Sequence, residues 1–172
     1  MRSLPSVVLI GSLILLASCA STPSGPAPTF NVQVTADTPV EIQVAAIASY
    51  GRNFLYGDGL AGFGVSVSNN TGKMARVNWE KSSVITNGTS SPPFISGMKY
   101  KDAGTTPPPL MVPSGGKISV DVFSASQPYY TGGQYATWIM QNIKTQKAQL
   151  IICVESEGKE IYFTVDATLS AP

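Results

Sequence analysis

The stretch 64–85, GVSVSNNTGKMARVNWEKSSVI, constrains the fold most, because it holds two period-two patterns separated by a turn-forming segment. Val65 and Val67 alternate with serines, which is typical of a strand with one buried face. Residues 69–72, Asn-Asn-Thr-Gly, interrupt the alternation with residue types that tolerate positive φ. Beyond them, every second residue up to Trp79 is apolar. We therefore expect a β-hairpin that carries Trp79 into the centre of a sandwich.

Period-two alternation recurs along the rest of the chain and predicts further strands. They cover residues 30–35, 40–48, 117–123, 150–154 and 161–166, with Glu157-Gly158 as the turn between the last two. The proline-rich segment 82–113 is expected to be irregular apart from one short edge strand, because proline donates no backbone hydrogen bond. Residues 136–144 show a weak helical pattern. The chain is predicted to be all-β, an antiparallel immunoglobulin-like β-sandwich of about seven or eight strands.

The N-terminus has a different composition from the rest of the chain. Arg2 precedes a ten-residue apolar run, 7–16, which is shorter than the roughly 20 residues that span a bilayer. Residues 19–29 then combine three prolines with serine, threonine and glycine, the composition of an extended tether. We expect a signal peptide over residues 1–18, a tether over 19–29 and one sandwich domain over 30–172.

The junction between the first two segments carries the most specific motif of the chain. It reads Leu16-Ala17-Ser18-Cys19 and resembles the lipobox of bacterial lipoproteins. The resemblance implies cleavage after Ser18 and attachment of lipid, including a palmitate-type acyl chain, to Cys19. Several acyl chains hold a protein on a membrane far more firmly than one. Ala20 after the cysteine implies, by the sorting habits of that family, the outer membrane, with the domain in the periplasm or at the cell surface. The alternative is an ordinary signal peptide with a chance cysteine.

A second resemblance concerns the mature domain. It rests on the order of several short motifs: N-N-T, V-N-W-E-K-S-S, G-M-K-Y, a proline run, V-P-S-G and E-G-K-E-I-Y-F. This order is similar to small bacterial envelope lipoproteins that have an immunoglobulin-like sandwich. The motifs are structural, so the resemblance implies a fold and transfers no catalytic residues.

Charge excludes some partners. Charged residues make up 12% of the chain, about half the usual share. Loss of residues 1–18 removes Arg2 and leaves ten basic and ten acidic residues. This balance argues against nucleic-acid binding and against a polybasic patch for anionic lipid.

The residue types that carry common catalytic and metal chemistry are scarce. The chain has no histidine, which excludes Ser-His-Asp and Cys-His arrangements and the usual zinc sites. Residues 57–62 match G-x-G-x-x-G, but a strand pattern follows where a dinucleotide site needs a helix. Cys153 lies in an apolar run and is expected to be a buried small hydrophobe, with no cysteine placed for an inter-sheet disulfide. We expect no cofactor, no metal and no enzymatic activity.

Aromatic residues in glycine-rich connections are the remaining candidates for recognition. One connection contains Tyr129, Tyr130, Tyr135 and Trp138, and another contains Tyr50, Phe54 and Tyr56. Tyrosine and tryptophan suit protein interfaces and sugar stacking, although such rings also plug the ends of sandwiches. Two functions are consistent with this pattern. The first is binding of another envelope protein, as an assembly accessory or a phage-type receptor-masking factor. The alternative is a glycan-binding module for peptidoglycan or surface polysaccharide.

Overall fold

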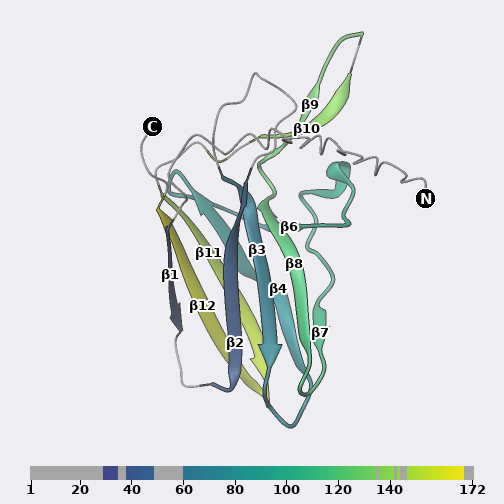
Figure 1. Cartoon of the computed structure of the whole chain (residues 1–172). Helices are drawn as coiled ribbons and strands as arrows, with labels where there is room; N and C mark the ends of the chain where they lie inside the picture. Colours follow the sequence, from purple (N-terminus) through teal and green to yellow (C-terminus); the bar gives the residue numbers. More distant parts are fainter. Residues whose placement is uncertain are drawn as a thin grey trace, which may run out of the picture.

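The computed structural model describes residues 29–34, 38–48, 60–134, 136–141, 143 and 147–168. The predicted signal peptide, Ser18, Cys19 and Tyr135 lie outside the described residues, as do Tyr50, Phe54 and Tyr56. Within the described part of the chain there are twelve strands and one short 3₁₀ helix, η1 (Tyr100–Asp102) (Figure 1). No helix in that part is long and apolar enough to cross a lipid bilayer.

The strands form two antiparallel sheets and a separate two-stranded ribbon. The first sheet has the order β1 (Thr29–Val34), β12 (Lys159–Thr168), β11 (Lys147–Ser156), β4 (Ala75–Thr86) and β5 (Thr89–Ser91), and β7 (Leu110–Val112) also pairs with β4. The second sheet has the order β2 (Val40–Ala48), β3 (Leu60–Asn69), β8 (Lys117–Ser124) and β6 (Pro93–Ile95). The ribbon consists of β9 (Pro128–Thr131) and β10 (Thr137–Met140).

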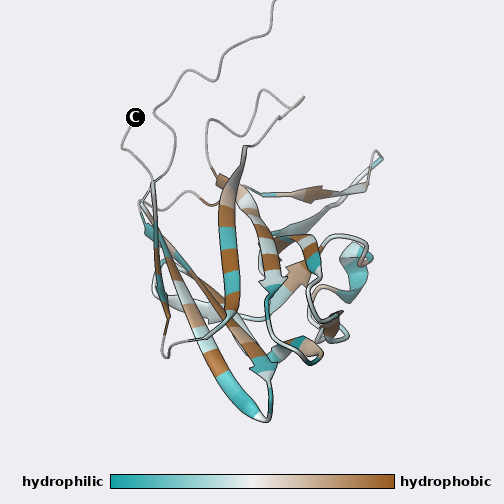
Figure 2. Ribbon diagram, turned by 60° about the horizontal axis from the view of Figure 1, so that its bottom comes forward, coloured by the Kyte–Doolittle hydropathy of each residue, from teal (hydrophilic) through white to brown (hydrophobic). Residues whose placement is uncertain are grey.

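This strand order is that of an immunoglobulin-type sandwich. β2, β3, β8 and β6 follow the A-B-E-D order of one sheet, and β12, β11, β4 and β5 follow the G-F-C-C′ order of the other. Hydrophobic and hydrophilic bands alternate along the sandwich strands in Figure 2, as the period-two patterns require. The predicted all-β antiparallel sandwich is therefore confirmed.

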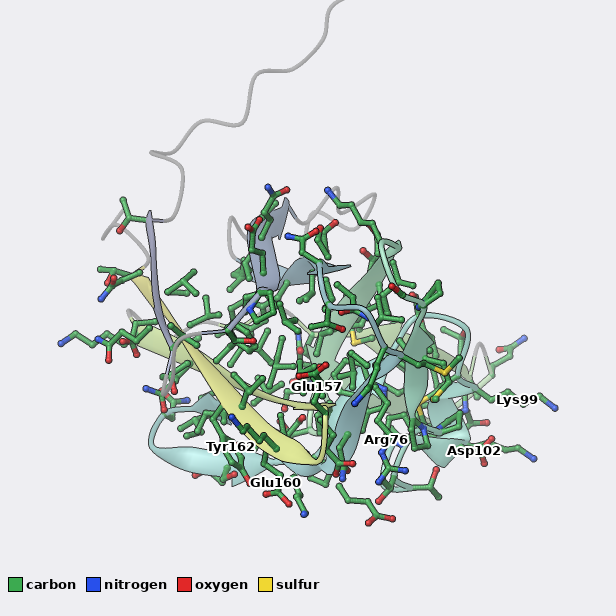
Figure 3. All side chains as sticks on the ribbon, turned by 90° about the horizontal axis from the view of Figure 1, so that it is seen from below. Arg76, Lys99, Asp102, Glu157, Glu160 and Tyr162 are labelled. Atoms are coloured by element: carbon green, nitrogen blue, oxygen red, sulfur yellow. The ribbon has the colours of Figure 1, made fainter. Side chains whose placement is uncertain are left out.

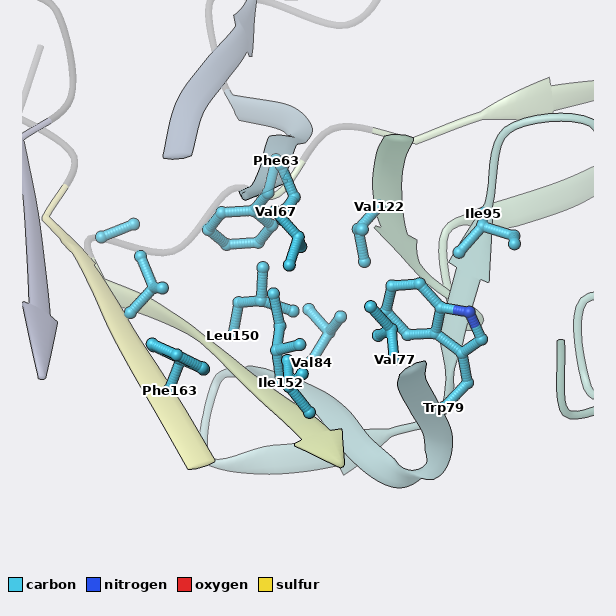
Figure 4. Packing of buried hydrophobic residues seen from close by; sticks show 14 of the residues in the cluster. Phe63, Val67, Val77, Trp79, Val84, Ile95, Val122, Leu150, Ile152 and Phe163 are labelled. Carbon is cyan, nitrogen blue, oxygen red and sulfur yellow. The ribbon is translucent and has the colours of Figure 1, made fainter. Parts of the chain in front are cut away.

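The core lies between the two sheets and contains the residues that the alternation placed inward. Trp79 is 1% exposed, and Val65, Val67 and Val77 are also buried. Figure 4 shows Trp79 close to Val77 in the cluster that joins both sheets. The predicted burial of Trp79 is confirmed, at the position on strand C where immunoglobulin domains also bury a tryptophan.

The predicted hairpin over residues 64–85 is wrong. β3 and β4 lie in different sheets, so the segment between them crosses the sandwich instead of joining paired strands. Asn69, fully buried, organises this crossing: its Nδ2 donates to the Lys73 carbonyl at 2.8 Å and the Val112 carbonyl at 3.0 Å. Its Oδ1 accepts from the Thr71 amide at 3.0 Å. Two strands with one apolar face each satisfy a hairpin or a crossing equally well, because alternation does not specify the pairing partner.

The segment 82–113 is more regular than its prolines suggest. β4 continues to Thr86, and Asn87 (φ 53°) and Gly88 (φ 72°) form a tight turn into β5. Both residues have the positive φ that a type I′ hairpin turn requires. The prolines are accommodated at edges, with Pro93 as the first residue of β6. The helical turn suggested by the weak pattern over 136–144 is also wrong, because residues 137–140 form the strand β10.

Candidate functional site

The predicted glycine-rich loop around Tyr129 is a two-stranded ribbon, residues 128–140, that projects from one end of the sandwich (Figure 1). Tyr130 pairs with Trp138, and Tyr129 pairs with Ile139. Directly opposed residues of an antiparallel pair share a face. The ribbon therefore presents Tyr130 with Trp138 on one face and Tyr129 with Ile139 on the other. We call residues 128–140 the aromatic ribbon.

A buried glutamine fastens the base of the aromatic ribbon to the sandwich. Gln127 is 4% exposed, and its Nε2 donates to the carbonyl oxygens of Ala61 and Gln141, both at 2.7 Å. Its Oε1 accepts from the Ser124 amide at 2.6 Å. The Gln141 amide also donates to the Gln127 carbonyl at 3.0 Å. Sequence reasoning missed Gln127, because a single glutamine in a loop has no pattern that distinguishes it from a solvated one.

A series of ring contacts connects the aromatic ribbon to the sandwich. The Tyr130 and Trp138 centroids are 5.3 Å apart, and Tyr100 of η1 lies 6.4 Å from Trp138. Tyr100 in turn lies 5.8 Å from Phe94, which is 2% exposed. The rings thus run from a buried phenylalanine to the projecting ribbon. Tyr100 was missed as a site residue, because it precedes Trp138 by 38 positions in the sequence and only the fold brings the two rings near each other.

The described rings of this group are exposed, so they are not plugs of the sandwich. The exposed fractions are 51% for Tyr129, 51% for Tyr130, 40% for Trp138 and 38% for Tyr100. The fourth predicted residue, Tyr135, lies outside the described residues. An exposed aromatic group of this kind is a typical feature of interaction surfaces.

Charged residues lie next to Tyr100 on the η1 side and are absent from the aromatic ribbon itself. Residues 128–140 contain no charged side chain. Lys99 and Lys101 flank Tyr100 and are both exposed, whereas Asp102 is partly buried. Figure 3 shows Lys99 extending away from the sandwich. The aromatic surface therefore has a mainly basic border on its η1 side.

The opposite end of the sandwich carries a cleft of about 440 Å³ near the β11–β12 turn. Met74 and Met111 line it and are 57% and 51% exposed. Two ion pairs cross its wall, from Arg76 to Glu155 and from Lys81 to Glu160. In Figure 3, which views this end, Arg76 and Glu160 lie on neighbouring parts of the surface.

These ion pairs favour the ionised form of Glu155 and Glu160. Hydrogen bonding to Arg76, then to Asn78, lowers the pKa of Glu155 below its ordinary 4.5. Hydrogen bonding to Lys81, then to Tyr162, does the same for the pKa of Glu160. The Glu160 contact also raises the pKa of Tyr162 to about 12. A general acid at neutral pH needs a raised carboxyl pKa, so both shifts have the wrong direction for that role.

Cys153 is fully buried, as predicted for a small hydrophobe. Its backbone amide donates to Ser82 Oγ at 3.0 Å, and that hydroxyl donates to the Asn78 carbonyl at 2.6 Å. Ser82 thereby supplies hydrogen bonds at the point where the β4–β11 register shifts. Burial raises the pKa of the Cys153 thiol, which opposes formation of the thiolate that a nucleophile requires.

Two further sequence predictions concern ligands. The G-x-G-x-x-G match begins outside the described residues, and from Leu60 it continues into β3, a strand and not a helix. Among the described residues, no group of three or more cysteine, aspartate or glutamate side chains is placed to hold a metal ion. Comparison of the chain with protein-family models, with curated proteins and with solved structures finds no match.

Proposed function

We propose that this protein is a lipid-anchored, non-catalytic protein of the bacterial cell envelope whose aromatic ribbon binds another envelope protein. The single observation that supports binding is the exposure of Tyr129, Tyr130 and Trp138 on a hydrogen-bonded ribbon, with the exposed ring of Tyr100 from η1 beside Trp138. The anchoring rests on the motif Leu16-Ala17-Ser18-Cys19. Such a protein would act as an assembly accessory of a membrane complex or as a phage-type factor that masks a receptor.

Binding energy at protein interfaces is concentrated in a few buried tyrosine, tryptophan and arginine side chains. The aromatic ribbon presents three of these rings in a restrained arrangement, since strand pairing and the Gln127 contacts fix its base. Restraint before binding lowers the entropy that association costs. The ribbon thus combines the aromatic residue types of protein interfaces with a conformation that is already restrained before binding.

The alternative, a glycan-binding module, has weaker support from the ring geometry. The planes of Tyr130 and Trp138 are inclined by 51°, and those of Tyr100 and Trp138 by 56°. Neighbouring rings therefore do not form one flat platform on which consecutive sugars of a chain could stack. The contacting aromatic edges and faces form an uneven surface that fits protein side chains better.

The test of binding compares matched variants of the full-length lipidated protein. Tyr130→Ala and Trp138→Ala are expected to weaken partner binding by about 1–2 kcal/mol or more each, measured by recovery of the partner from detergent-solubilised envelopes. Met111→Ala is the control, because Met111 is as exposed as Tyr130 but lies at the cleft end. Equal recovery from all three variants would contradict the role of the ribbon. Recovery of peptidoglycan or polysaccharide in place of a protein would favour the glycan alternative.

The test of anchoring uses Cys19. Native protein is expected to partition into detergent and to incorporate labelled palmitate, whereas Cys19→Ser leaves an uncleaved or soluble form. Native protein in the soluble fraction with an intact Met1 would contradict lipid attachment.

A further inference from the structure

The chain enters the sandwich at the end that carries the aromatic ribbon. Thr29, the first residue of β1, pairs with Thr168, and Thr168 pairs with Lys147, the first residue of β11. Ile143 lies four residues before Lys147 and forms a bridge to Leu60, the first residue of β3. The ribbon base is bonded to Ala61, the next residue. Figure 1 shows the start of β1 and the ribbon at the same end of the molecule.

Covalent geometry then limits how far this end can lie from the membrane. Cys19 precedes Thr29 by ten residues. Ten extended residues span at most about 36 Å. β11 is ten residues long, so the cleft end is separated from this end of the sandwich by roughly 34 Å. A lipid on Cys19 therefore keeps the ribbon end near the bilayer, while the tether can let the cleft end point away from it.

We infer that the aromatic ribbon binds the extramembrane surface of an integral membrane protein that resides in the same membrane as the lipid anchor. This inference rests on the proposed function, since it requires both the lipid on Cys19 and a protein partner for the ribbon. Beyond the proposed function, we infer the location of the partner, which is the same membrane, and the chemistry of the surface that the ribbon contacts. A partner that shares the membrane is confined close to the ribbon, so its effective concentration is raised by the common anchor.

Two features indicate a protein surface as the occupant in preference to the lipid itself. The described residues at the ribbon tip are Gly132, Gly133 (φ 94°) and Gln134, whereas the exposed rings lie along the sides of the ribbon. A hairpin that inserts into lipid would present apolar side chains at its tip. Lys99 and Lys101 border the ring surface. The complementary surface is therefore an apolar strip with carboxylates beside it.

The experiment uses photo-crosslinking in intact cells with the full-length lipidated protein. A photoreactive phenylalanine analogue replaces Tyr130 in one variant and Met111 in the other, two positions with the same exposed fraction of 51% at opposite ends of the sandwich. We expect at least tenfold more protein adduct from position 130 than from position 111. That adduct should stay in the membrane pellet after an alkaline carbonate wash and dissolve only in detergent.

Two further variants make the inference specific. Replacing residues 1–19 with an ordinary cleavable secretion signal gives a soluble form, in which adduct yield should fall at least tenfold because the shared membrane no longer confines the two proteins. In the lipidated form, Lys99→Glu combined with Lys101→Glu should lower the yield severalfold through repulsion from the partner's carboxylates. The thermal transition of each variant is measured alongside, so that unfolding is not mistaken for lost binding.

The remaining outcomes separate the inference from the proposed function. A protein adduct that carbonate releases, or one whose yield is unchanged in the soluble form, overturns the inference and leaves the protein-binding function in place. Adducts with phospholipid alone overturn both, because the ribbon then contacts the bilayer. Equal yields from positions 130 and 111 also overturn both, since the ribbon then has no preferred partner.

Discussion

The two tryptophans of the chain lie on strands of the same protein in opposite environments. Trp79 on β4 is 1% exposed, and the second sheet covers it. Trp138 on β10 is 40% exposed, and its ring contacts come from Tyr130 across the ribbon and from Tyr100 of η1. A strand buries its aromatic residues only where a second layer packs over it. The ribbon has no such layer, so the same side chain that stabilises the sandwich is free to contact a partner there.

Removing each indole is the strongest way to break this comparison. Trp79→Ala should lower the free energy of unfolding by about 3–5 kcal/mol, because it leaves a large cavity in the core. Trp138→Ala should lower it by less than about 1 kcal/mol, since the ring is 40% exposed and no second sheet covers it. Urea unfolding followed by circular dichroism measures both values. Glu80→Ala, on the exposed neighbour of Trp79, is the control. Similar losses for the two tryptophans would mean that the ribbon belongs to the core.

The crossing between the two sheets has no counterpart in the ribbon, and substitution of Asn69 tests what stabilises it. Asn69→Ala removes an amide that bonds the Lys73 and Val112 carbonyls and the Thr71 amide. Buried polar groups without partners should lower the free energy of unfolding by roughly 1–3 kcal/mol. The shift of the urea unfolding midpoint measures this loss. Asn70→Ala, at the exposed next position, should change stability by about 0.5 kcal/mol or less. Equal effects would show that the crossing is held by packing alone.

The smallest expected effect concerns acid stability at the cleft end. The pKa of Glu155 is lowered below 4.5 in the folded chain, chiefly by its bond to Arg76. A lowered folded pKa means that the unfolded chain binds the proton more readily, so this contribution is present above pH 4.5 and is lost as the pH falls below it. Thermal melts between neutral pH and pH 3 should therefore show a shallower decline for Glu155→Gln. A decline as steep as that of the native chain would exclude this ion pair as a cause.

The alternation of apolar and polar residues predicted correctly which side chains are buried in the sandwich. It did not predict correctly which strands pair with each other. Val65, Val67 and Trp79 are buried as expected, because one apolar face must turn inward in any sheet arrangement. The crossing after Asn69 differs from the predicted hairpin, since the same residue types serve both kinds of turn. Which sheet a strand joins depends on contacts with residues distant in the chain, and local patterns do not contain that information.

The ribbon shows a similar division. The grouping of Tyr129, Tyr130 and Trp138 could be read from their proximity in the sequence. Their exposure could not, because it depends on whether a second layer covers the segment. The contribution of Tyr100 and the anchoring role of Gln127 required the fold, since their partners come from other elements. The predicted lipidation of Cys19 has the opposite basis: it comes from a local motif and does not depend on the fold.

The most direct test of the account is partner recovery with a folded protein that lacks the ribbon. The Gln127 carbonyl and the Gln141 amide are bonded at 3.0 Å, so a short glycine-containing turn can replace residues 128–140 and close the chain. We predict that the melting temperature falls by at most about 4 °C, as expected for a loss near 1 kcal/mol in the free energy of unfolding. We also predict that the partner is lost from detergent extracts of the lipidated protein. Undiminished recovery of the partner by this folded variant would contradict the claim that the aromatic ribbon is the recognition surface.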